Sequence, residues 1–252
     1  VTIRGYIGSE KSNYLNNPAV KAILEDEYGL IVDYSKAGSI EMIRLDSGEM
    51  DFLWPSSQVA LELYKLITGE AAVKSSRIFD SPIVFYSWDF ITEALIKAGL
   101  VEKVDDSYYV VDFPALIDHV LQEKTWADIG LDDLHGKISV TSTDPTKSNS
   151  GNMYSGLIAN LLYGSDSDVV DQTGIQEVLP TLVDFFKMQG MMEHSTGILF
   201  EQYLTRGVMA PIPIVVGYEN QIVEFSLHEP GVWDRVKGSM RILYPVPTVW
   251  SS

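Results

Sequence analysis

The sequence predicts an α/β protein built as two lobes, each with a mixed sheet flanked by helices. Short apolar runs alternate along the chain with segments of helical periodicity, a pattern typical of parallel βαβ pairing. Two longer apolar runs, near residues 80–88 and 211–220, indicate strands that cross from one lobe to the other. A length of 252 residues suits one large domain or two small α/β lobes.

Three strand–turn–helix units are expected in the first part of the chain. The apolar runs predict strands at residues 1–7, 30–34 and 50–54. The helical spacing of apolar residues predicts helices that begin near Pro18, near Ile40 and at Gln58. Gly29 and Gly48 are expected to end the first two helices, because glycine is favoured just past a helix C-terminus.

A second segment, residues 97–207, is expected to build its own strands and helices. Its most informative part is residues 142–152, in which five of the eleven side chains carry a hydroxyl. This stretch lies between a strand-like run at 137–140 and a helical run at 154–162. A hydroxyl-rich turn in that position places O–H donors beside the first unpaired N–H groups of the helix. Such an arrangement suits a polar or anionic ligand.

Serine-bearing turns also follow the first three predicted strands. Ser9 follows the first strand, Ser39 the second and Ser57 the third. Ligands of open α/β sheets bind at the carboxyl ends of strands, so similar turns at these junctions indicate one shared cleft. The alternative for each of these serines, and for Ser148 and Ser150, is that it only caps the following helix.

Four segments of the chain resemble a known family. They are Gly8-Ser9-Glu10-Lys11, Ala37-Gly38-Ser39-Ile40, Trp54-Pro55-Ser56-Ser57 and residues 144–151, and the segments Ser195-Thr196-Gly197 and 215–220 add to the resemblance. In this order they are similar to the extracellular or periplasmic solute-binding proteins of bacterial ABC importers, of the type II class. The resemblance spans nearly the whole chain. It implies a periplasmic-binding-protein-like fold in which two discontinuous lobes are joined by two crossing strands.

Within this family the chain is similar to the molybdate-, sulfate- and phosphate-type binders. In those proteins Ser and Thr hydroxyls and helix N-termini hold a tetrahedral oxyanion between the lobes. We expect one lobe to comprise residues 1–84 and 214–252 and the other residues 85–213, with a hinge near 80–88 and 211–220. The resemblance implies ligand contacts from the first lobe by Ser9, Ser39 and Ser57, and from the other lobe or the hinge by Thr143, Ser148, Ser150 and Tyr218.

The resemblance is imperfect at the first turn. Glu10 and Lys11 form a charged pair that a cage of neutral hydroxyls does not need, and this leaves the ligand class open. Lysines such as Lys11 and Lys147 are more often solvated than bound to a ligand. Tyr218 has a structural alternative as well, as a buried anchor with a bonded hydroxyl.

The composition and motifs exclude several classes of function. A formal net charge of −17 argues against nucleic-acid binding, which requires basic surface. The chain has no cysteine, which excludes disulfides and thiolate metal sites, and its four histidines lack metal-ligand spacing. It has neither a Gly-x-Ser-x-Gly elbow nor a Gly-x-x-x-x-Gly-Lys-Ser/Thr loop. We therefore expect no enzyme activity, no metal and no cofactor.

The expected function is the extracellular solute-binding component of an ABC importer, which captures a small polar or anionic solute between its lobes by hinge closure. The expected partners are that solute and the transporter permease, and the expected state is a monomer. No apolar run is long enough to span a membrane, so we expect attachment only through a leader or lipid anchor missing from this chain. The expected location is the periplasm or the extracellular face of the membrane. The alternative is a ligand-sensing domain of a signalling or cell-surface protein with the same fold.

Overall fold

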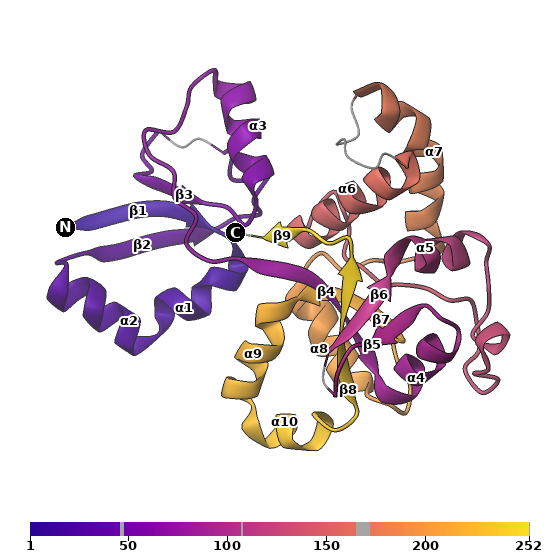
Figure 1. Cartoon of the computed structure of the whole chain (residues 1–252). Helices are drawn as coiled ribbons and strands as arrows, with labels where there is room; N and C mark the ends of the chain where they lie inside the picture. The colour runs from indigo at the N-terminus through magenta and orange to yellow at the C-terminus, as the bar shows by residue number, and fades with distance from the viewer. Residues whose placement is uncertain (46–47, 107, 165–171, 252) are drawn as a thin grey trace. The chain divides into compact units, whose positions relative to one another are not determined.

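The computed structural model describes residues 1–45, 48–106, 108–164 and 172–251. The chain divides into two compact units (Figure 1). Unit 1 comprises Val1–Asp80 and Trp250–Ser252, and unit 2 comprises Ser81–Val249. Each unit has its own sheet with helices beside it, so the predicted α/β class is confirmed.

The sheet of unit 1 has three parallel strands in the order β2-β1-β3. They are β1 (Thr2–Ile7), β2 (Ile31–Lys36) and β3 (Phe52–Trp54). In the register of this sheet, Ile7 pairs with both Lys36 and Trp54. The three strands therefore end level with one another, and the turns that follow them leave the same edge of the sheet. The short strand β9 (Trp250–Ser251) also belongs to this unit.

The helices of unit 1 are short and begin at residues that favour helix starts. A 3₁₀ turn, η1 (Ser9–Lys11), leads into α1 (Ser12–Asn16), α2 (Pro18–Ala22), the π-helical turn η2 (Ile23–Glu27) and, after β3, α3 (Gln58–Thr68). Asn17 caps α2 by accepting a hydrogen bond from the Ala19 N–H, and Pro18 occupies the first helical position. Gly29 follows the helical segment with φ 63°, as its predicted role requires.

The predicted helix that begins near Ile40 is wrong. Residues 39–44 form turns, in which Met42 N–H donates to the Gly38 carbonyl and Leu45 N–H to the Glu41 carbonyl. Such isolated bonds close single turns without propagating into a helix. The apolar spacing that suggested a helix instead buries Met42 and Ile43 in the small core of this unit, together with Ala37 and Ala60. The predicted helix end before Gly48 falls at residues 46–47, outside the described part of the chain.

The strands of unit 2 lie in the order β5-β6-β8-β4-β7. They are β4 (Ser81–Trp88), β5 (Val101–Lys103), β6 (Tyr109–Asp112), β7 (Ile214–Tyr218) and β8 (Met240–Val246). β4 runs antiparallel to β7 and β8, whereas β6 and β8 are parallel, so this sheet is mixed. Every residue of β4 after Ser81 is buried, as expected for an apolar strand covered on both faces.

Helices surround this sheet and complete the larger core of the protein. They are α4 (Asp89–Lys97), α5 (Phe113–Leu121), the 3₁₀ turn η3 (Ala127–Ile129), α6 (Asn149–Tyr163), α7 (Gln172–Met188), α8 (Thr196–Arg206), α9 (Glu219–His228) and α10 (Pro230–Val236). At the centre of the core, the Phe85 ring of β4 meets the rings of Phe113 and Tyr154 edge-on.

The division between the units differs from the predicted lobes. Residues 214–249, expected in the first lobe, lie in unit 2, because β7 and β8 both pair with β4. The chain passes between the units at Asp80–Ser81 and again at Val249–Trp250, so the predicted second crossing near 211–220 lies within unit 2.

The predicted strand before the hydroxyl-rich turn is also wrong. Residues 138–140 lie outside regular structure, and Lys137 makes one isolated bridge to Thr125. The next residue, Thr141, makes a parallel bridge to Val215 of β7. Its N–H donates to the Ile214 carbonyl, and its carbonyl accepts from the Val216 N–H, both at 2.9 Å. This single bridge places the hydroxyl-rich turn beside the carboxyl-terminal half of β7.

The central aromatic packing makes a prediction about stability. Phe85 is fully buried, so Phe85→Ala is expected to destabilise the protein by about 3–5 kcal/mol through lost contacts and a residual cavity. Phe90→Ala removes the same side chain from a partly exposed position on α4 and is expected to have a smaller effect. Urea titration followed by far-ultraviolet circular dichroism measures both. Equal midpoints for the two variants would contradict the assigned core.

Candidate functional site

In unit 1 the turns after β1, β2 and β3 are joined at Ser56, which is 2% exposed. The Lys11 ammonium donates to the Ser56 hydroxyl at 2.7 Å. The Ser56 N–H donates to the Ser39 hydroxyl at 2.9 Å, and the Ser251 hydroxyl donates to the Ser56 carbonyl at 2.6 Å. We call Lys11, Ser39, Ser56 and Ser251 the Ser56 junction. Ser56 lies in the Trp54-Pro55-Ser56-Ser57 motif, but the sequence alone predicts no role for it.

The three predicted ligand serines of unit 1 differ in their surroundings. Ser57 accepts a hydrogen bond from the Val59 N–H at 3.1 Å, so it caps α3, as the structural alternative held. Ser39 is 3% exposed and accepts from Ser56 rather than from a helix of its own. In both of these bonds the hydroxyl uses its oxygen, and the O–H proton remains a donor. The side chain of Ser9 lies outside the described part of the structure.

Lys11 is more buried than expected. Its side chain is 11% exposed, and its ammonium lies 2.8 Å from a Glu10 carboxylate oxygen and 5.6 Å from the centre of the Trp54 ring. The expectation that Lys11 is solvated is therefore wrong, whereas Lys147 is 66% exposed as expected. The positions of Glu10 and Ser56 beside Lys11 depend on a glycine at residue 8. A Cβ there would lie 2.5 Å from Glu10 Oε1 and 2.7 Å from the Ser56 hydroxyl.

In unit 2 the hydroxyl-rich turn closes into a cluster of four hydroxyls, those of Thr143, Ser148, Ser150 and Thr196. The Thr143 hydroxyl donates to Ser148 at 2.9 Å and lies 2.8 Å from that of Ser150. The Ser148 and Ser150 hydroxyls are 3.0 Å apart, and Ser150 is also bonded to Thr196. We call these four residues the hydroxyl cluster. The structure thus brings three predicted ligand residues together and adds Thr196, which sequence reasoning missed as a ligand residue although it quoted the Ser195-Thr196-Gly197 motif.

Two helix N-termini meet at the hydroxyl cluster. α6 follows its N-cap Ser148, and α8 follows its N-cap Ser195 and begins with Thr196. Neither N-cap side chain accepts a hydrogen bond from its helix. The capping alternative for Ser148 is therefore wrong, because its hydroxyl bonds within the cluster. The positive ends of two helices of 15 and 11 residues are directed toward these hydroxyls, an arrangement that favours negative charge.

The hydrogen bonding of the cluster is internal and close to saturated. Thr143 and Ser150 are each 1% exposed, and buried hydroxyls are costly unless they are bonded. Each hydroxyl has one proton, so four hydroxyls can satisfy the four contacts among themselves. Ser148 is partly exposed and forms the accessible side of the cluster. A ligand oxygen that reaches Ser148 can accept the proton of the Ser148 hydroxyl without exposing the other three hydroxyls to solvent.

Tyr218 lies next to this cluster through α6. Its hydroxyl accepts a hydrogen bond from the Asn149 side-chain amide at 2.9 Å, and Asn149 is the first residue of α6. Tyr218 is 6% exposed and its N–H donates to Gln221, so it also serves as the buried anchor that the alternative described. Its carbonyl accepts from the Tyr86 hydroxyl, whose pKa burial raises well above the usual range. Tyr86 therefore remains a donor at every physiological pH.

Asp144 fixes the shape of the turn before α6. Its carboxylate accepts from the Thr146 hydroxyl at 2.6 Å and the Thr146 N–H at 2.9 Å, and its other oxygen lies 3.3 Å from the Lys147 ammonium. The hydrogen bond from the Thr146 hydroxyl is the largest cause that lowers the pKa of Asp144 below its usual value. Asp144 thus accepts hydrogen bonds from the donors of the turn, and the Ser148 and Ser150 hydroxyls bond within the cluster.

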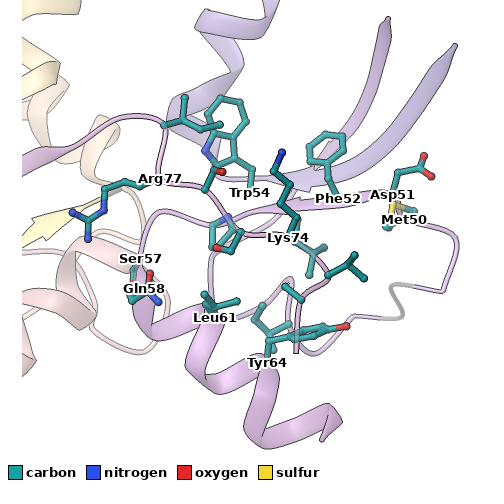
Figure 2. Close-up of a pocket in the computed structure, with 18 residues that line it drawn as sticks. Met50, Asp51, Phe52, Trp54, Ser57, Gln58, Leu61, Tyr64, Lys74 and Arg77 are labelled. Atoms are coloured by element: carbon teal, nitrogen blue, oxygen red, sulfur yellow. The ribbon is translucent and has the colours of Figure 1, made fainter. Parts of the chain in front are cut away.

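Unit 1 also contains a cavity of about 510 Å³ beside β3 and α3 (Figure 2). Figure 2 shows Leu61 and Tyr64 of α3 on one side and the segment that carries Lys74 across from them. Ser57 is a predicted ligand residue that lines it. Among the described lining residues, none belongs to the Ser56 junction, although Trp54, whose ring centre lies 5.6 Å from the Lys11 ammonium, is one of them.

Comparison with known proteins identifies the fold. No protein-family model and no curated protein sequence matches the chain. Among solved structures, it is similar to the sulfate-binding protein SubI from Mycobacterium tuberculosis H37Rv, with a TM-score of 0.52 and 14% identity over 100% of this chain and 72% of that one. A structure described as a "periplasmic putative metal binding protein" has the same TM-score, with 13% identity over 96% of this chain and 74% of that one.

The chain has the fold of the type II periplasmic solute-binding proteins. The resemblance drawn from the sequence is thus confirmed at the level of the fold. In the part of this periplasmic-binding-protein fold that the structure describes, no helix is long and apolar enough to cross a membrane. The same residues contain no group of three or more His, Asp or Glu side chains that could hold a metal ion.

The contact between α6 and the hydroxyl-rich turn makes the second prediction. A Cβ at Gly151 would overlap the Thr143 carbonyl oxygen, so Gly151→Ala is expected to destabilise the protein by about 1–3 kcal/mol and to displace the cluster. Gly156→Ala, on the same helix with no atom within 4 Å of the new Cβ, is expected to stabilise it by about 0.5–1 kcal/mol. Thermal denaturation of the two variants measures the difference. Equal shifts of the same sign would contradict the packing.

The pKa of Asp144 makes the third prediction. In Thr146→Val the pKa is expected to rise toward its usual value, because the variant loses the hydroxyl hydrogen bond that lowers it most. Since the folded pKa is lowered, the bonds to this carboxylate add stability above the unfolded value of about 3.9 and lose it as the pH falls through the folded value.

Carboxyl carbon NMR titration measures this pKa, and Thr125→Val provides a matched control. The pKa of Asp128 is lowered by its hydrogen bonds with the Thr125 N–H and hydroxyl. The control variant is therefore expected to raise the pKa of Asp128 and leave that of Asp144 unchanged. An Asp144 titration that is the same in Thr146→Val and in the unmodified protein would show that Thr146 does not hold this carboxylate.

Proposed function

We propose that this protein is the solute-binding component of an ABC importer and that its ligand is a small anion, first among them a tetrahedral oxyanion such as sulfate or molybdate. The observation that carries the proposal is the hydroxyl cluster at the N-termini of α6 and α8. Four hydroxyls and two helix N-termini supply donors only for negative charge or for acceptor oxygens. The sulfate-binding protein that shares the fold is consistent with this choice.

The energetics of such a site are favourable without a formal counter-charge. A hydrogen bond to a charged group contributes about 1.5–3 kcal/mol, and a helix N-terminus adds about 0.3–1 kcal/mol when exposed and more when buried. Micromolar affinity corresponds to about −8 kcal/mol after the costs of association, so several contacts of this kind are needed. The Ser148 proton and the two helix N-termini supply some of them, and the remaining donors have to come from other residues.

The remaining parts of the expected function stay proposals. Ser39 and Ser57 have hydroxyl protons to donate from unit 1, and their contribution to binding, like capture by lobe closure, is a prediction from the sequence. We propose binding without catalysis, because the hydroxyls of the cluster bond to one another rather than to a base. A permease partner, a monomeric state and a location outside the cytoplasmic membrane complete the proposal. The sensing alternative shares the binding step and differs in the partner that responds to it.

Removing one hydroxyl at the accessible side of the cluster tests the proposal. A thermal-shift screen with sulfate, molybdate, tungstate, phosphate, amino acids and sugars first identifies the anion that raises the melting temperature. Ser148→Ala is then expected to weaken that anion by tenfold to a hundredfold in titration calorimetry, because it loses one hydrogen bond to a charged group, about 1.5–3 kcal/mol.

Ser155→Ala is the matched control for this titration. Ser155 lies on the same helix, but its hydroxyl donates to the Asn152 carbonyl and not to the cluster. The control is expected to bind the anion as the unmodified protein does. Either of two outcomes would contradict the proposal: none of the oxyanions binds, or the oxyanion binds equally well to Ser148→Ala and Ser155→Ala.

A further inference from the structure

We infer that Lys11 makes the carboxyl edge of the unit 1 sheet an anion-binding surface and that Glu10 competes with an anion for the Lys11 ammonium. The pair would then set how strongly unit 1 favours a doubly charged anion over a singly charged one. This inference rests on the proposed function, because it assigns residues that respond to the charge of the ligand. The hydroxyl cluster of unit 2 has no formally charged group of its own.

The Lys11 ammonium is held in a largely buried position. The Lys11 side chain is 11% exposed in a chain that carries 35 acidic and only 18 basic residues. Burying a charge is unfavourable unless it is paired and hydrogen-bonded, and an exposed lysine would need no such arrangement. Here the partners come from three sources: the Glu10 carboxylate, the Ser56 hydroxyl and the face of Trp54. A solvated surface pair, such as Glu62 with Lys65 on α3, has none of this support.

Lys11 also lies at the edge of the sheet where a ligand is expected. Lys11 follows β1, the middle strand of a three-stranded parallel sheet, and lies at the edge where all three strands end. Open α/β sheets bind ligands at this edge. Through Ser56 the ammonium is linked to Ser39 from the turn after β2 and to the turn that starts α3. Lys11 is therefore placed among the three turns, not on an outer face of unit 1.

Unit 1 has donors left over for a ligand. An ammonium has three N–H groups, and the bonds to Glu10 and Ser56 use two of them. One N–H of Lys11 is left for a ligand. The hydroxyls of Ser39 and Ser57 accept hydrogen bonds from backbone N–H groups and so retain their protons. Unit 1 therefore offers two neutral hydroxyl donors and one N–H donor from a charged ammonium.

Glu10 opposes the binding of an anion at Lys11. Its side chain is 37% exposed, so water or an anion can reach the pair. An anion near Lys11 is attracted by the ammonium and repelled by the carboxylate, and both forces grow with the charge of the anion. Removing the carboxylate must therefore strengthen anion binding, and removing the ammonium must weaken it. A purely structural ion pair predicts effects of the same sign, because either loss would disturb the same turn.

The experiment compares the two halves of the pair in the full chain. Sulfate and perchlorate serve as probes, since both are tetrahedral oxyanions and they differ by one charge. Lys11→Met is expected to weaken sulfate at least tenfold and perchlorate less, whereas Glu10→Gln is expected to strengthen sulfate severalfold. Lys11→Arg keeps the charge and is expected to retain more sulfate binding than Lys11→Met. Calorimetric titration at two salt concentrations gives the affinities, and circular dichroism verifies the fold.

Lys65→Met and Glu62→Gln are the matched controls, because they break an ion pair of similar length, 2.9 Å, on the exposed face of α3. Neither control is expected to change the affinity for either probe. If Lys11→Met fails to fold, Glu10→Gln alone decides, since only a competitor predicts tighter sulfate binding. Sulfate affinity that falls in both Glu10→Gln and Lys11→Met, or that matches the controls, overturns the inference. Unmodified protein that binds neither probe nor any other oxyanion overturns the proposed function instead.

Discussion

The structure depends on one constraint: hydroxyl and N–H groups that are buried in the turns before helices must find partners. The first N–H groups of a helix have no partner within the helix itself. Ser56, Thr143 and Ser150 are each at most 2% exposed in or beside such turns, and each is bonded to another side chain. Satisfying these groups ties the turns together, and the tied turns form the candidate binding surfaces.

The two units meet this constraint in different ways. In unit 2 the partners are neutral, and four hydroxyls bond to one another at two helix N-termini. In unit 1 the buried backbone and hydroxyl of Ser56 are satisfied partly by a charged group, Lys11. A neutral cluster can exchange one partner for a ligand oxygen with little change in charge. A charged junction cannot, because an ammonium that loses contact with Glu10 needs another anion in its place.

Much of the fold could be predicted because hydrophobic periodicity and turn residues act locally. β1, β2 and α3 lie close to the predicted ranges, and Gly29 follows its helix with the positive φ that glycine favours. The helix expected near Ile40 failed because turns are enough to bury the apolar residues of this segment, Met42 and Ile43, in the small core. Long-range pairing was also beyond the sequence. Nothing local indicates that β8 joins β4, which moves residues 214–249 into unit 2. For the same reason hydroxyls could be assigned to turns, but the bond between Ser150 and Thr196 could not be predicted.

The overall charge explains why the donors must be local. With a net charge of −17, the mean field of the protein repels anions within about 8 Å of its surface, the Debye length in physiological salt, and is screened farther out. Binding energy for an anion must then arise within a few ångströms, from hydrogen bonds and helix ends that screening affects little. The hydroxyl cluster and the Ser56 junction both operate at that range, with donor–acceptor distances of 2.7–3.0 Å for Lys11 and Ser148. A buried cation beside a carboxylate has no long-range field, yet it can still distinguish charge at contact. On the proposed function, the protein selects by contact those anions that its net charge does not attract from a distance.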